Sequence, residues 1–151
     1  MKTFIQITAV FIFVFTMGAC KTNLSGVKKE PEGITEKYWK LIEINGQPVV
    51  PDESVKREAF IILKDEGNLV NGNGGCNTLS GTYEIDRTTN RIKFSQMAST
   101  MMACLNMEIE NQLKRTLEMA DNYSLSADGK YLSLNRARMA PLARFELVYL
   151  K

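Results

Sequence analysis

Residues 72–83 read Gly-Asn-Gly-Gly-Cys-Asn-Thr-Leu-Ser-Gly-Thr-Tyr and place four glycines and one cysteine within twelve positions. This composition is compatible with a phosphate-binding loop, a metal site, a reactive thiol or a turn. The glycine spacing is not that of a dinucleotide-binding loop, because position 77 is Asn and the following segment alternates like a strand. Since glycine accepts backbone angles that other residues disfavour, we interpret the stretch as a bulge or tight reversal between strands, which also suits Asn73 and Asn77.

Short segments with the alternation of β-strands lie on both sides of this stretch. The sequence predicts strands at residues 38–44, 59–63, 68–72, 81–86, 91–94, 123–125, 131–134 and 145–149. Residues 107–120 are predicted to form the main helix, because Ile109, Leu113 and Leu117 make an apolar stripe and Asn106 is a good N-cap. Many short antiparallel strands with one helix late in the chain predict a single α+β domain.

The N-terminal segment resembles a bacterial lipoprotein signal peptide. Lys2 precedes an apolar run that is shorter than the ~20 residues of a membrane-spanning helix, and the run ends in Gly18-Ala19-Cys20. The resemblance implies cleavage after residues 1–19, acylation of Cys20, and a lipidated, flexible tether over residues 20–35. The folded domain then spans residues 36–151. An ordinary secretory signal is the alternative.

A protein anchored at Cys20 would lie in the bacterial cell envelope. Lys21 stands where an aspartate would commonly mark retention in the inner membrane, so the outer membrane is favoured. The membrane is therefore the first expected partner, reached through the lipid anchor.

The overall composition excludes several classes of function. The chain has no histidine, which removes Ser-His-Asp and Cys-His catalysis and most zinc chemistry. The formal net charge is only +2 and no basic run resembles a nucleic-acid footprint, so we expect no nucleic-acid partner. We also expect no metal and no cofactor. The methionines at positions 97, 101, 102, 107 and 119 are more typical of core gap-fillers than of soft-metal ligands.

Two cysteines remain once Cys20 is assigned to the lipid. Beyond the cytoplasmic membrane, Cys76 and Cys104 could form a structural disulfide or act as a redox pair. Redox pairs usually have the Cys-x-x-Cys spacing at a helix N-terminus, whereas these two lie far apart in the sequence. We therefore expect a structural bridge, with the two Cα atoms less than about 7 Å apart.

Several motifs in order carry a family resemblance. They are Gly74-Gly75-Cys76-Asn77, then Gly81 and Tyr83, then Thr100-Met101-Met102-Ala103-Cys104, and then Glu110 early in the helix, with Trp39 in the opening strand and Tyr123 after the helix. This pattern resembles the META domain, the family of the heat-shock lipoprotein HslJ, over about residues 36–150. The family often has Arg where this chain has Met101, so any role of that charge does not transfer.

The resemblance implies a small antiparallel, barrel-like β-sheet domain with one main helix, found in envelope lipoproteins linked to heat shock and antibiotic tolerance. It implies no established catalytic activity. We therefore expect a non-enzymatic envelope lipoprotein with a binding or structural role in stress tolerance, and a protein or small-molecule partner that the sequence does not identify.

The motif residues are expected to be structural. Trp39, Tyr83 and Tyr123 suit an aromatic core and Asn77 a turn, while Glu110 suits either a buried donor near the glycine turn or the positive end of the helix dipole. Two other functions stay open. A ligand carrier would use the barrel interior and needs a cavity of several hundred Å³ there. A thiol–disulfide active protein would use Cys76 and Cys104.

Overall fold

The computed structural model describes residues 33–50, 57–138 and 140–149. The expected signal peptide at residues 1–19, the lipid-modified Cys20 and the tether up to residue 32 lie outside these ranges, so those predictions stay predictions. Within the described ranges, no helix combines the length and apolarity that a membrane crossing requires.

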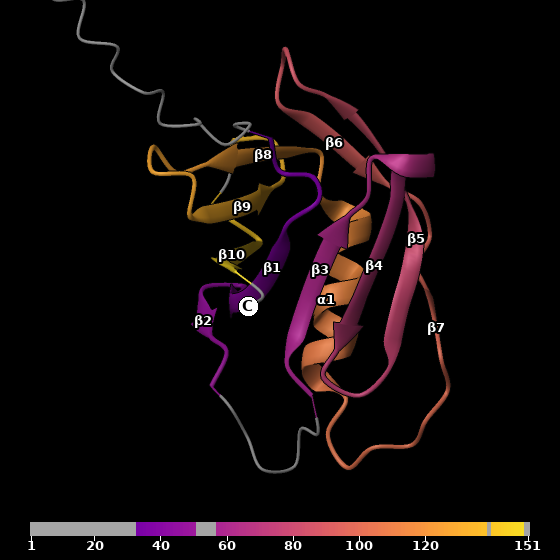
Figure 1. Ribbon diagram of the computed structural model, residues 1–151. Helices are drawn as coiled ribbons and strands as arrows, with labels where there is room; N and C mark the ends of the chain where they lie inside the picture. Colours follow the sequence, from indigo (N-terminus) through magenta and orange to yellow (C-terminus); the bar gives the residue numbers. More distant parts are fainter. Residues whose placement is uncertain (1–32, 51–56, 139, 150–151) are drawn as a thin grey trace, which may run out of the picture. The chain divides into compact units, whose positions relative to one another are not determined.

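The folded part of the chain is a closed antiparallel β-barrel with one α-helix (Figure 1). Its barrel strands are β1 (Tyr38–Ile44), β3 (Ala59–Leu63), β4 (Leu69–Gly74), β5 (Thr78–Asp86), β6 (Arg91–Phe94), β8 (Asn122–Leu125), β9 (Tyr131–Asn135) and β10 (Ala143–Val148), hydrogen-bonded in that order. The pairing of β10 with β1 closes the ring. The expected small, barrel-like α+β fold with one main helix is confirmed.

Three shorter elements lie outside the ring of strands. The two-residue strands β2 (Gln47–Pro48) and β7 (Ala98–Ser99) pair with β1 and β5, and the 3-10 turn η1 (Glu66–Asn68) precedes β4. Neither short strand was predicted, because two residues are too few to establish an alternating pattern.

Two strand pairings of the barrel differ in length, and we call the long one its strong seam and the short one its weak seam. The first and last strands pair along their whole length, from Tyr38 opposite Val148 to Ile44 opposite Ala143. By contrast, β6 and β8 share a single residue pair, Arg91 opposite Asn122. The end of helix α1 (Glu108–Met119) contacts β6 beside this weak seam.

Apolar side chains fill the inside of the barrel. On β1, Trp39, Leu41 and Ile44 are buried, and the Trp39 indole N–H donates to the Ile34 carbonyl at 2.7 Å. Figure 1 shows α1 lying along β4, and the helix buries Leu113 and Leu117 against the sheet. The apolar stripe predicted for the helix is therefore the face that closes the core.

Two element boundaries differ from the prediction. β4 continues to Gly74 and β5 begins at Thr78, so most of the glycine-rich stretch is strand, because the pairing with β3 overrides the low strand propensity of glycine. The helix begins at Glu108 with Met107 in the capping position, which corrects the prediction of Asn106 as N-cap. The Asn106 side chain still accepts a hydrogen bond from the Glu108 N–H at 3.0 Å.

Candidate functional site

The glycine-rich stretch forms the tight turn between β4 and β5. The Gly74 N–H donates to the Asn77 carbonyl at 3.0 Å, and the Asn73 side chain accepts from the Gly75 N–H at 2.7 Å. Gly75 has a φ of 105°, which L side chains rarely adopt, so this position requires glycine. The interpretation of the stretch as a tight reversal is confirmed.

Asn77 joins this turn to the first turn of α1. Its side chain is fully buried and that of Glu110 is 2% exposed. The Glu110 carboxyl group accepts a hydrogen bond from the Asn77 N–H at 2.7 Å and a second from the Asn77 side-chain amide at 3.1 Å. Of the two roles considered for Glu110, the structure therefore establishes the reach to a buried donor. The carboxyl group also sits at the favourable end of the helix dipole.

The same asparagine also holds the loop that precedes the helix. Its side-chain oxygen accepts from the Thr100 hydroxyl at 2.8 Å and from the Met102 N–H at 2.7 Å. Its amide nitrogen donates to the Met102 carbonyl at 3.3 Å. The hydrogen bonds of Asn77 thus connect three segments: the turn, the loop before the helix, and the helix. Buried polar groups are tolerated when they are hydrogen-bonded in this way.

Position 74 requires glycine because the helix approaches the turn closely there. A Cβ atom at this position would lie 2.5 Å from the Glu110 Cγ and 2.7 Å from the Glu110 Cβ. Gly81 is similarly tight, because a Cβ there would lie 2.7 Å from the Met97 sulfur. Both glycines therefore leave room for a neighbouring side chain rather than for a ligand.

Cys76 and Cys104 form a disulfide, as expected. Their Cα atoms are 6.2 Å apart, within the predicted limit. Cys76 is buried, and the bridge ties the same turn to the same loop that Asn77 connects. Ala103, the small residue beside Cys104, is exposed, and nothing in the structure explains its size.

The motif aromatics belong to the core. Trp39, Tyr83 and Tyr123 are all buried, and the Tyr83 hydroxyl donates to the Lys64 carbonyl at 3.1 Å. Burial raises the pKa of both tyrosine hydroxyls above the ordinary value. All three side chains belong to the hydrophobic core.

The expectation that the methionines fill core gaps is right for only part of the set. Met97 is 4% exposed and packs beside Gly81. Met101 is 98% exposed, and Met102 and Met119 are exposed as well, so the expectation is wrong for these three. The loop geometry set by Asn77 and the disulfide keeps positions 101 and 102 at the surface.

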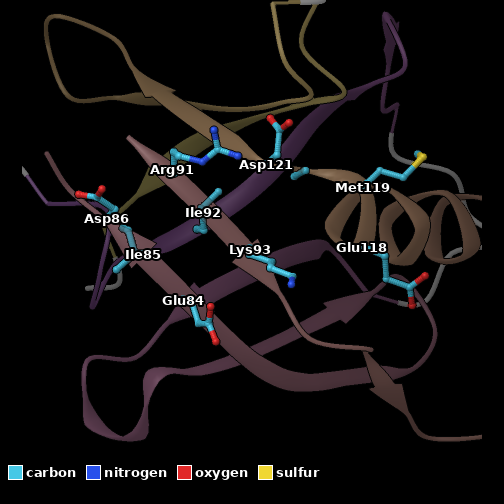
Figure 2. A pocket seen from close by; sticks show the side chains of 10 residues that line it. Glu84, Ile85, Asp86, Arg91, Ile92, Lys93, Glu118, Met119 and Asp121 are labelled. Carbon is cyan, nitrogen blue, oxygen red and sulfur yellow. The ribbon is translucent and has the colours of Figure 1, made fainter. Parts of the chain in front are cut away.

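A groove of about 540 Å³ lies at the weak seam of the barrel (Figure 2). It is lined by Glu84, Ile85, Asp86, Arg91, Ile92, Lys93, Glu118, Met119, Ala120 and Asp121. The lining comes from β5, β6 and the end of α1. Sequence reasoning missed this groove, because nothing in the sequence brings residues 84–93 next to residues 118–121.

The groove has apolar residues below and charged residues around its edge. Ile92 and Ala120 are buried, whereas Glu84, Lys93 and Glu118 are exposed. Figure 2 shows Arg91 extending toward Asp121. Hydrogen bonds from the Ala137 N–H and the Asn122 side chain lower the pKa of Asp121, and the Thr89 hydroxyl lowers that of Asp86. Both carboxyl groups are therefore ionised at neutral pH.

The groove is distinct from the interior cavity that a ligand carrier would need. Its charged lining residues, except Asp121, are exposed, whereas the barrel interior is occupied by the buried side chains of residues such as Trp39, Leu79 and Phe145.

The comparisons with known proteins agree with this architecture. The family model of the META domain matches residues 32–149. The fold is similar to an NMR structure of a protein from Burkholderia xenovorans, at 20% identity and a TM-score of 0.57 over 76% of this chain and 83% of that one.

A second similar fold is the crystal structure of a DUF4847 family protein from Bacteroides vulgatus, at 15% identity and a TM-score of 0.53 over 77% of this chain and 94% of that one. At these identities both structures show likeness of fold alone. No curated protein matches the chain.

Proposed function

Because the chain belongs to the META domain family, we propose that it is a non-enzymatic lipoprotein of the bacterial cell envelope, anchored at Cys20 and most simply in the outer membrane. Its barrel has a binding or structural role in envelope stress tolerance. The observation that carries this proposal is the Cys76–Cys104 disulfide, because such bonds form and persist in oxidising compartments. The Gly18-Ala19-Cys20 sequence adds the means of attachment.

The hydrogen bonds of the motif residues support a structural rather than a catalytic role. Glu110 and Tyr83 are the motif side chains best suited to proton transfer, and they bond to Asn77 and to the Lys64 carbonyl. Glu110 is also buried, whereas a general base must lie within hydrogen-bond reach of its substrate. The bridge between Cys76 and Cys104 braces the same network, which favours a structural disulfide over thiol–disulfide activity.

We place the binding role at the groove beside β6 and the end of α1. Its volume of about 540 Å³ falls in the range of roughly 300–1,000 Å³ that is usual for ligand pockets. Within the residues that the structure describes, Glu84, Lys93 and Glu118 make no ion pair, so these charges are free to meet a partner protein or small molecule.

The proposal is tested in a deletion strain that is challenged by heat. Wild-type protein should restore survival and fractionate with the membrane, whereas Cys20→Ala should be released or stay uncleaved and restore less. The double substitution Glu84→Gln/Glu118→Gln should stay anchored but lose the rescue. Glu66→Gln, an exposed carboxyl group on η1, is the control.

Equal rescue by all variants would contradict both the anchor and the groove. Loss of rescue by Cys20→Ala alone would support the anchor and remove the groove from the account.

A further inference from the structure

The methionine sulfurs of the barrel differ sharply in exposure. Met101, in the loop between β7 and α1, is 98% exposed, and Met102 beside it is 47% exposed. Met119 at the end of α1 is 40% exposed, whereas Met97 is only 4% exposed. Leu105 in the same loop is 97% exposed, so the exposure of Met101 belongs to the loop as a whole.

The loop is held by backbone hydrogen bonds and by the disulfide, and these contacts do not involve the methionine side chains. The Met102 backbone bonds to the Asn77 side chain through both its N–H, at 2.7 Å, and its carbonyl, at 3.3 Å. The disulfide holds Cys104 to Cys76 two positions further along. These contacts hold the loop with the Met101 side chain in solvent, and the two thioethers take no part in them.

The cysteines of the same region do not compete for oxidants. Oxidation of cysteine proceeds from the thiolate, and Cys76 and Cys104 are joined in a disulfide. In the described part of the chain, which contains no other cysteine, the thioethers are thus the sulfurs open to oxidation. Among these, Met101 is the most exposed.

We propose that Met101, together with Met102, is an oxidation site for two-electron oxidants of the hypochlorous acid and peroxide class. The Met101 sulfur donates an electron pair to the chlorine of hypochlorous acid, and a sulfur–chlorine bond forms as the oxygen–chlorine bond breaks and hydroxide leaves. Water then attacks the sulfur, the sulfur–oxygen bond forms and chloride leaves. The products are methionine sulfoxide, chloride and a proton that passes to water. Sulfur is oxidised and the hypochlorous acid is reduced.

The placement of these residues allows the sulfoxide to form without disturbing the fold. Conversion of a methionine to its sulfoxide makes an apolar side chain polar, which disrupts a core but not a solvent-exposed side chain. Met97 fills the space beside Gly81 in the core, so its conversion to the sulfoxide would disturb the fold. The protein can therefore consume oxidant at the loop while the barrel remains folded.

The test is a time course of the disulfide-bonded protein with limiting hypochlorous acid. After quenching, reduction and trypsin cleavage, one peptide covering residues 94–114 contains Met97, Met101, Met102 and Met107. Tandem mass spectrometry then assigns each sulfoxide within a single peptide. Met101 should be oxidised at least about tenfold faster than Met97, with a melting temperature unchanged at the stage when only the loop is modified.

Matched variants separate this site from general surface oxidation. Met101→Leu/Met102→Leu keeps apolar side chains of similar volume and should markedly slow the consumption of the first equivalent of oxidant. Met119→Leu is the control and should change it little. Oxidation of Met97 or Met119 as fast as Met101, or a lower melting temperature on oxidation of Met101 alone, would overturn the proposal.

Discussion

The Glu110 carboxyl group on α1 is bound twice by Asn77 in the turn between β4 and β5, through the backbone N–H at 2.7 Å and the side-chain amide at 3.1 Å. This contact fastens the helix to the barrel in a region from which water is excluded. Hydrogen bonds of this kind contribute most when neither partner has an alternative in solvent.

Asn77→Ala should lower the free energy of unfolding by roughly 2–4 kcal/mol, because Glu110 loses a donor while it stays buried and the Met102 loop loses its acceptor. Urea unfolding measures the change. Asn71→Ala is the matched control, since Asn71 is exposed on β4, and it should cost no more than about 0.5 kcal/mol. Similar losses in the two variants would contradict the role given to Asn77.

Gly74→Ala should cost about 1–3 kcal/mol, because the new methyl group would lie 2.5 Å from the Glu110 Cγ and push the helix from the turn. Gly33→Ala is the control. Its Cβ would meet nothing closer than 3.6 Å, so its melting temperature should match that of the wild type. A Gly74→Ala protein as stable as the wild type would refute the tight approach.

Removal of the disulfide should destabilise the oxidised protein by about 3–4 kcal/mol in the chain-entropy model, since the bridge closes a sequence separation of 28. The single variants Cys76→Ala and Cys104→Ala should melt alike, and the double variant little lower, because the two residues share one interaction. Dithiothreitol should lower the melting temperature of the wild type but not that of the double variant. A wild-type protein insensitive to the reductant would count against a stabilising bridge.

The alkaline limit of stability should depend on Tyr38. Burial and the neighbouring Glu58 raise the pKa of its hydroxyl to about 12, from an ordinary 10.0. The neutral phenol is therefore favoured in the folded state, so this contribution is complete below pH 10 and is lost as the pH rises toward 12. Tyr38→Phe should show a smaller loss of stability across that window in urea titrations. An identical pH profile for the two proteins would remove Tyr38 as the cause.

Much of the fold could be predicted, because the longer strands alternate and Leu113 and Leu117 mark the inner face of the helix. The turn at Gly75 could be predicted from the glycines and asparagines that surround it. The double contact between Asn77 and Glu110 could be suspected but not established, since a glutamate in the first turn of a helix suits the dipole equally well. The exposure of Met101 could not be predicted, because it depends on how the loop is held.

The groove was beyond prediction for a related reason. It lies where the end of α1 meets β5 and β6, next to the seam at which β6 and β8 share a single residue pair. Local patterns in the sequence report which residues alternate or form a stripe, and they do not report where two distant segments stop pairing.

The most direct test of the account is the intact mass of the protein extracted from membranes without reductant. The account predicts a chain that begins at Cys20, carries a diacylglyceryl group and an N-linked acyl chain, and is lighter by two hydrogens because of the Cys76–Cys104 bond. A mature chain that begins at another residue with a free amino group, or one whose two later cysteines both react with an alkylating agent before reduction, would contradict it.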